Sequence, residues 1–216
     1  SSISRATAIS SSRTIRAPWF RQPCGGFSAG KRLSVYTTVA PDQLALWLAP
    51  LGVGAPGTLT GIAAGMQNSN YFVTAGGRPW VLTLFEHLAP RDLDFYLAFQ
   101  DHLAVRAIPC PRPLATADGR FWRPLAGKPA ALFNCLPGEC IEAPTAAHCR
   151  TLGAMLARLH LAGADFPSPL PNPCGHDWRE RTGRRLAPAL PADERGRLRA
   201  ELDFQAAQDY SRLPRG

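Results

Sequence analysis

The spacing of apolar residues changes once along the chain, and this change restricts the possible folds more than any other feature. Between residues 58 and 133 the apolar segments are short and separated by Gly, Pro and Asn, as in β-strands, with one helical pattern at 91–107. From residue 145 to residue 210 the apolar residues recur at helical spacing. This order predicts an α+β protein with two lobes of different class and a cleft at their connector.

The predicted elements follow from these patterns. The expected strands are 58–62, 71–74, 80–85 and 130–133, with a hairpin of 114–116 and 121–124. The expected helices are 38–51, 91–107, 145–161, 177–186 and 193–210. In the helix 145–161 one stripe is expected to form the core of the helical lobe, and it consists of Leu152, Met155, Leu156 and Leu159.

The net charge of +8 is unevenly distributed. Residues 1–32 hold six of the 24 basic residues and no acidic residue, so residues 33–216 carry 18 basic and 16 acidic residues. A nearly neutral body does not offer the basic face that nucleic-acid binding requires. No apolar run reaches the roughly 18 residues of a membrane span. We therefore expect neither nucleic acid nor membrane as a partner.

The first 32 residues are rich in Ser and Arg, and we expect them to be a disordered leader. Their composition resembles an organelle transit peptide, and translated upstream sequence would look the same. The six cysteines form no CxxC pair, which favours free thiols in a reducing, cytoplasmic environment. No set of Cys and His residues has the spacing of a zinc site, so we assign no metal ligand.

A glycine-rich segment, GIAAGMQNSNYFV at 61–73, precedes the second expected strand. Gly61 and Gly65 would allow the backbone to approach phosphate groups, which Cβ atoms would obstruct. Asn68, Ser69 and Asn70 would supply polar groups near the tip of the loop. A plain hairpin whose glycines only serve the turn remains the alternative. A Walker A motif is absent, and the order of elements does not fit a Rossmann fold.

Residue-level similarity adds to this interpretation, because residues 34–216 resemble bacterial homoserine kinases of the aminoglycoside-phosphotransferase-like type. The segments that carry the resemblance are GMQNSNYFV (65–73), WVLTLFE (80–86), IPCPRPL (108–114), ALFNCLPGE (131–139) and LGAMLARLH (152–160). Members of this family begin near Ser-Val-Tyr-Thr after a Met, and here Leu33 stands in that place. This favours upstream translation as the origin of residues 1–32.

The resemblance implies a protein-kinase-like fold, with a complete strand-rich N-lobe in 33–134. Residues 135–216 would be the hinge and first part of an incomplete helical C-lobe. It further implies ATP and Mg²⁺ as cofactors and transfer of the ATP γ-phosphoryl to the hydroxyl of L-homoserine, in threonine biosynthesis. We keep two alternatives: another small-molecule kinase of this fold, of the aminoglycoside or choline type, and a non-catalytic nucleotide-binding fragment.

By the same resemblance, the loop 61–70 would lie over the ATP phosphates and Val81 would face the adenine. Asn134, Cys135 and Leu136 would form the hinge, with backbone groups that pair with the adenine edge. Thr83 occupies the place where kinases carry a phosphate-binding Lys, so more of the phosphate charge would fall to Mg²⁺.

The catalytic loop of this fold has the form His-x-Asp…Asn, followed by a later metal-binding Asp. In residues 139–216 neither His148, His160 nor His176 is followed by Asp at that spacing. We expect the catalytic residues and metal ligands beyond Gly216, so the chain alone is expected to be inactive. We treat the histidines as structural or surface residues, and leave open whether Glu86 and Glu139 form a carboxylate pair.

Overall fold

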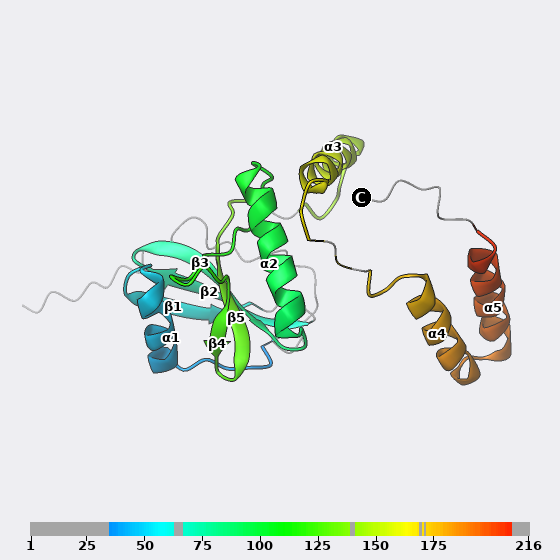
Figure 1. Ribbon diagram of the computed structural model, residues 1–216, viewed down its shortest axis with the longest axis horizontal. Coiled ribbons are helices and arrows are strands. Elements are labelled where there is room, and N and C mark those ends of the chain that lie inside the picture. Colours follow the sequence, from blue (N-terminus) through cyan, green and yellow to red (C-terminus); the bar gives the residue numbers. More distant parts are fainter. Residues whose placement is uncertain (1–34, 63–66, 139–140, 169, 171, 209–216) are drawn as a thin grey trace, which may run out of the picture. The chain divides into compact units, whose positions relative to one another are not determined.

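The computed structural model describes residues 35–62, 67–138, 141–168, 170 and 172–208 (Figure 1). The chain divides into two compact units. The first, which we call the sheet unit, comprises the chain up to Leu88 together with Pro111–Thr151. The second, the helical unit, comprises Ala89–Cys110 and the chain from Leu152 onward. This division differs from the predicted boundary at residue 134.

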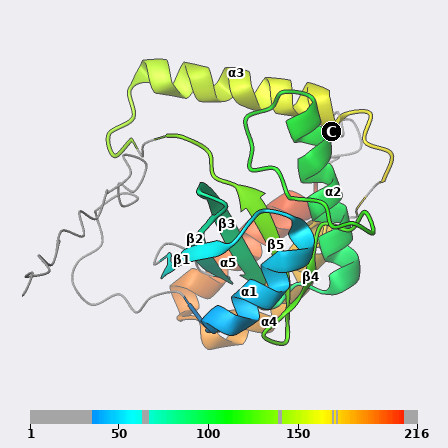
Figure 2. The same cartoon turned by 90° about the vertical axis from the view of Figure 1, so that its left-hand side faces the viewer.

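The sheet unit contains a five-stranded antiparallel sheet with the strand order β1-β2-β3-β5-β4 (Figure 1, Figure 2). The strands are β1 (Pro56–Gly61), β2 (Asn68–Ala75), β3 (Arg78–Phe85), β4 (Arg123–Leu125) and β5 (Lys128–Asn134). All five overlap strands that the sequence predicts, and β2, β3 and β5 extend further than predicted. The α+β class is confirmed.

Two tight turns connect neighbouring strands. Gly76 and Gly77, with φ of 55° and 72°, join β2 to β3, as a two-residue hairpin of the type I′ kind requires. Ala126 and Gly127, with φ of 48° and 76°, join β4 to β5 in the same way. The second turn went unrecognised in the sequence because alanine rarely adopts a positive φ.

The predicted hairpin of 114–116 with 121–124 is wrong, because β4 pairs with β5 instead. The segment before it runs beside β5, where the N–H of Leu114 donates to the carbonyl of Leu132 at 2.8 Å. The Asp118-Gly119 turn is local: the N–H of Thr116 donates to the carbonyl of Arg120 at 2.7 Å.

One helix of the sheet unit covers one face of the sheet. α1 (Pro41–Leu48) continues into a 3₁₀ turn (Ala49–Leu51) and ends at Gly52, which has a φ of 65°. This confirms the helix predicted at 38–51. Its buried face packs into one core with strand residues from one side of the sheet. The core members are Val39, Leu44, Trp47, Leu48, Tyr71, Val73, Ala75, Leu82, Leu84, Leu125, Ala130 and Leu132.

The helical unit begins with α2 (Pro90–Val105), whose second half contacts the turn after α3 (Ala146–Gly163). The ring of Phe166 lies 5.1 Å from that of Phe99 and 4.9 Å from that of His102, between centroids. His102 also bonds to the carbonyl of Ala162 at 3.0 Å, which gives this histidine a structural partner. These contacts explain why α2 belongs with the later helices rather than with the strands on either side of it in the sequence.

The remaining helices are α4 (His176–Leu186) and α5 (Ala192–Ala206), which pack against each other. All four helices predicted after residue 90 are confirmed, within a few residues of their expected ends. The stripe of α3 that is expected to form the core of the helical lobe is not covered in the part of the chain that the structure describes. Leu152 and Leu156 are 60% and 47% exposed, and α3 has no buried residue. None of the described helices is long and apolar enough to cross a membrane.

Candidate functional site

The register of the sheet sorts the predicted nucleotide-binding residues between two faces. Asn70 lies opposite Thr83, and Phe72 lies opposite Val81, across β2 and β3. Since successive side chains of a strand point to opposite faces, these residues share the face that α1 does not cover. Asn68, two residues before Asn70, belongs to it as well. We call this side of the sheet the Thr83 face.

Polar groups on the Thr83 face are tied to one another. The hydroxyl of Thr83 donates to Oδ1 of Asn70 at 2.8 Å, and Nδ2 of Asn70 donates to the carbonyl of Asn68 at 3.4 Å. Thr83 is buried, while Asn68, Asn70 and Val81 are half-buried. The structure therefore brings four predicted site residues together. They offer neutral hydrogen-bonding groups and one apolar surface, and none of the four carries a charge.

The glycine-rich loop is shorter than predicted. Asn68, Ser69 and Asn70 belong to β2 rather than to the loop tip, since β1 ends at Gly61 and β2 begins at Asn68. Asn and Ser are unfavourable in strands, but pairing along the whole length of β3 overrides that preference here. Gly65 lies outside the described residues.

Gly61 and Ser69 lie on the side of the sheet that α1 covers. A Cβ at Gly61 would stand 3.0 Å from Cγ2 of Val35, so this glycine leaves room for the segment that precedes α1. Ser69 is 0% exposed and its hydroxyl accepts the backbone N–H groups of Tyr36 and Thr37 at 2.8 and 2.9 Å. The structure thus separates both residues from the Thr83 face, against the prediction that they line one site.

A buried carboxylate lies beside Ser69. Glu86, with a side chain only 4% exposed, follows β3, and its Oε1 accepts the hydroxyl of Ser69 at 2.6 Å. Its Oε2 accepts the hydroxyl of Thr37 at 3.0 Å and lies 3.1 Å from Nζ of Lys128. We call these four residues, Thr37, Ser69, Glu86 and Lys128, the Glu86 cluster.

The cluster keeps its carboxylate ionised. Burial by itself would raise the pKa of Glu86, but the hydrogen bonds from Ser69, Thr37 and Lys128, together with the positive charge of Lys128, hold the pKa below its ordinary value. The sequence did not indicate Lys128 as the partner of Glu86. The pairing of β3 with β5 would have indicated it, because Leu84 lies opposite Ala130 and the next residues on that face are Glu86 and Lys128. The suggested partner Glu139 lies outside the described residues.

The three predicted hinge residues differ in whether their backbone N–H groups are already hydrogen-bonded. Asn134 is the last residue of β5, where its N–H donates to the carbonyl of Arg112 at 3.2 Å and its Oδ1 accepts the N–H of Arg112 at 2.5 Å. Its N–H is therefore not available to an adenine. Cys135 and Leu136 follow the strand, and the described residues supply no hydrogen-bond partner for their N–H groups. Burial raises the pKa of the Cys135 thiol, which therefore stays protonated at neutral pH.

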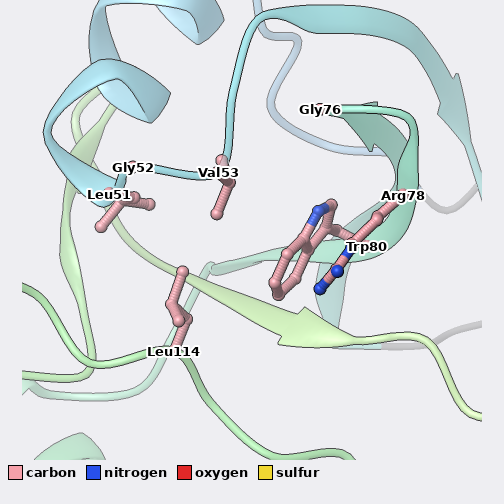
Figure 3. A pocket seen from close by; sticks show the side chains of 7 residues that line it. All are labelled: Leu51, Gly52, Val53, Gly76, Arg78, Trp80 and Leu114. Atoms are coloured by element: carbon pink, nitrogen blue, oxygen red, sulfur yellow. The ribbon is translucent and has the colours of Figure 1, made fainter.

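A shallow hollow of about 320 Å³ lies elsewhere on the sheet unit, at the opposite end of β3 from Thr83 (Figure 3). Side chains from the end of α1, the start of β3 and the segment beside β5 converge on it. Its lining residues are Leu51, Gly52, Val53, Gly76, Arg78, Trp80 and Leu114. It contains none of the predicted site residues, so its volume does not make it the candidate site. Among the described residues, no group of three His, Cys, Asp or Glu side chains could hold a metal ion.

The chain is similar in sequence to known phosphotransferases. A family model described as a phosphotransferase enzyme family matches residues 58–215. The homoserine kinase of Methylobacillus flagellatus is 43% identical over 184 residues, which cover 85% of this chain and 58% of that protein. The homoserine kinase of Cupriavidus taiwanensis is 44% identical over 179 residues, which cover 81% of this chain and 54% of that protein. The chain therefore spans less than two thirds of the length of these relatives.

Among solved structures, a spectinomycin phosphotransferase in complex with ADP and spectinomycin aligns with 68% of this chain and 46% of its own. The sequence identity is 16% and the TM-score is 0.44. The family match, together with the antiparallel sheet and the helices that follow it, agrees with the expected protein-kinase-like fold.

Proposed function

Because the chain belongs to the phosphotransferase enzyme family, we propose that it forms the nucleotide-binding part of a homoserine kinase. Such an enzyme transfers the γ-phosphoryl group of MgATP to the hydroxyl of L-homoserine. The observation that carries the proposal is the identity of 43% and 44% to two proteins named homoserine kinase, over more than four fifths of this chain.

The Thr83 face supplies groups of the right kind for a nucleotide. Val81 offers an apolar surface for the adenine, and the Asn70 amide, oriented by Thr83, offers a hydrogen-bonding group for the phosphates or the ribose. The N–H groups of Cys135 and Leu136 are the remaining backbone candidates for the adenine edge. Bound Mg²⁺ would neutralise the phosphate charge that the neutral Thr83 cannot balance.

Phosphoryl transfer depends on positioned carboxylates and metal ligands, and the His-x-Asp…Asn motif is absent from 139–216. We therefore expect residues 1–216 to bind MgATP without turning it over. The test measures two quantities on the same preparation: binding of a non-hydrolysable MgATP analogue by calorimetry, and ADP release with ATP and L-homoserine. Binding without ADP release above a no-enzyme control is the expected result. ADP release that depends on homoserine would contradict the expected inactivity, and a lack of analogue binding would contradict the nucleotide site.

The acceptor is tested on a longer protein that includes the catalytic loop. We expect ATP turnover that L-homoserine stimulates and that choline and aminoglycosides do not. Stimulation by choline or an aminoglycoside alone would instead assign the chain to another kinase of this family. We also propose a cytoplasmic location, which the free thiols of Cys110, Cys135, Cys149 and Cys174 support.

A further inference from the structure

The Glu86 cluster connects four segments of the sheet unit at one end of the sheet. Thr37 comes from the segment before α1, Ser69 from the start of β2, Glu86 from the residue after β3, and Lys128 from the start of β5. Lys128 makes a second contact, from Nζ to the carbonyl of Glu86 at 3.2 Å. Tyr71 adds a hydrogen bond from its hydroxyl to the carbonyl of Thr37 at 2.6 Å. One buried carboxylate therefore joins the start of β2, the end of β3 and the start of β5, which lie at the same end of the sheet.

Stability alone does not account for such an arrangement. The Glu86 side chain is 4% exposed and that of Lys128 is 36% exposed, so the carboxylate loses most of its hydration, and this loss offsets much of its attraction to the lysine. A hydrogen-bonded network of this kind does fix geometry, since each partner has only a narrow range of acceptable distances and angles. The cluster is therefore better suited to set the positions of the strand ends than to strengthen the core.

The strand ends that the cluster fixes carry the candidate site on their other side. Ser69 and Asn70 are neighbours in β2, so a backbone position that satisfies the Ser69 hydroxyl also sets the direction of the Asn70 amide. Asn70 is bonded to Thr83, three residues before Glu86 in the sequence. The two groups share the same short length of β2 and β3, one on each face of the sheet.

We propose that Glu86 and Lys128 are positioning residues for nucleotide binding, which act through Ser69 on Asn70 and Thr83 without touching the nucleotide. This inference rests on the proposed function, because it assumes that the Thr83 face binds MgATP. It assigns to the chain a charged pair that contributes to nucleotide binding from the opposite side of the sheet. β3 itself carries Thr83 at the place where kinases have a phosphate-binding lysine.

The variants for the test are Glu86→Gln, Lys128→Met and Lys128→Arg, with Thr116→Val as the control. The hydroxyl of Thr116 donates to the carbonyl of Arg120 at 2.7 Å in an exposed local turn of the sheet unit, outside both the cluster and the Thr83 face. For each variant we would measure the dissociation constant of the MgATP analogue, the urea midpoint of unfolding, and the NMR signals of the Asn70 side-chain amide without nucleotide.

We expect Glu86→Gln and Lys128→Met to weaken analogue binding roughly tenfold, because a displaced binding group loses a large part of its contribution. We also expect both to shift the Asn70 amide signals in the absence of nucleotide. Lys128→Arg keeps the charge and should retain most of the affinity, and Thr116→Val should leave both readouts as in the wild type.

Wild-type affinity and unchanged Asn70 signals in Lys128→Met, whatever its urea midpoint, would overturn the inference and leave the cluster with a structural role. If Glu86→Gln does not fold, the comparison of Lys128→Met with Lys128→Arg decides. A wild-type chain that does not bind the analogue would refute the proposed function. The Asn70 signals would still report whether the cluster positions this amide.

Discussion

Leucines are buried in the core of the sheet unit, whereas several are exposed in the part of α3 that belongs to the helical unit. Leu48 and Leu82 are 1% and 0% exposed, because α1 closes over one face of the sheet. Leu152, Leu156 and Leu161 of α3 are 60%, 47% and 78% exposed. Both regions contain the apolar repeat that predicts a buried helix face. The helical spacing of apolar residues thus predicts that a helix has a face suited to burial. Only the structure shows which element packs on that face.

The two regions also differ in the interactions that stabilise their helices and strands. The strands and α1 are held by a shared core, whereas α3 has no buried residue and depends on its own backbone hydrogen bonds over most of its length. In proteins most of the stability of a helix comes from packing of its apolar face, and α3 has no buried residue to provide it. We therefore expect the sheet unit to respond strongly to core substitutions, and α3 to respond mainly to changes in helix propensity.

The largest expected effect comes from a matched pair of leucine substitutions. Leu82→Ala empties a fully buried position and should lower the free energy of unfolding of the sheet unit by about 2–5 kcal/mol. Leu156→Ala removes a largely exposed side chain and should change it by less than about 0.5 kcal/mol. Urea unfolding followed by amide exchange in β3 measures both. Equal losses in the two variants would remove the distinction between the regions.

A pair of glycine substitutions tests whether the backbone is more restricted in the β2–β3 turn than in α3. Gly76 has a φ of 55°, and a Cβ there would collide with the carbonyl oxygen of Val53. Gly76→Ala should therefore cost about 2–3 kcal/mol, from the left-handed backbone and the clash together. Gly153 in α3 has no atom within 4 Å of an added Cβ, so Gly153→Ala should stabilise that helix by about 0.5–1 kcal/mol. Thermal unfolding and helix circular dichroism report the two changes, and a stabilised Gly76→Ala would contradict the turn geometry.

The Glu86 cluster predicts a pH dependence that belongs to the sheet unit. Glu86 has a lower pKa in the folded chain than its ordinary value, so its contribution to stability is fully present above the pKa of an unfolded Glu, about 4.3. That contribution is lost as the pH falls through the lower, folded-state pKa. The unfolding midpoint should therefore fall more steeply with acid in the wild type than in Glu86→Gln. Parallel curves for the two proteins would mean that the carboxylate gains nothing from its partners.

The sequence predicted elements better than it predicted how they meet. Periodicity located the helices and most of the strands, because period 2 and period 3.6 arise from backbone geometry alone. It placed β4 near the predicted strand 121–124 but gave that strand the wrong partner, because the turn after β4 places Ala126 at a positive φ that no propensity favours. It also could not show whether the stripe of α3 is covered, since amphipathicity does not identify a packing partner.

In the candidate site, too, the sequence predicts the residues better than their arrangement. It suggests one polar loop tip of Asn68, Ser69 and Asn70, although as strand residues these alternate between the two faces of the sheet. The alternation leaves Asn68 and Asn70 beside Thr83 and turns Ser69 toward Glu86. Because Glu86 and Lys128 are 42 residues apart, their pairing required the register of β3 with β5, which no local pattern contains.

The smallest expected effect lies in the helical unit, at the polar contact between α2 and the turn after α3. Arg106 donates to Asp165 at 2.7 Å, and His102 lies 3.1 Å from the same carboxylate, which is 65% exposed. Exposed ion pairs contribute little to stability because water and salt screen them. Asp165→Asn should therefore leave the urea midpoint unchanged within error, while amide exchange at residues 162–166 increases. The aromatic contact beneath it provides the control: Phe166→Ala removes the ring that packs on Phe99 and His102 and should release α2 from that turn. If Asp165→Asn proved as damaging as Phe166→Ala, this part of the helical unit would depend on its charges rather than on its rings.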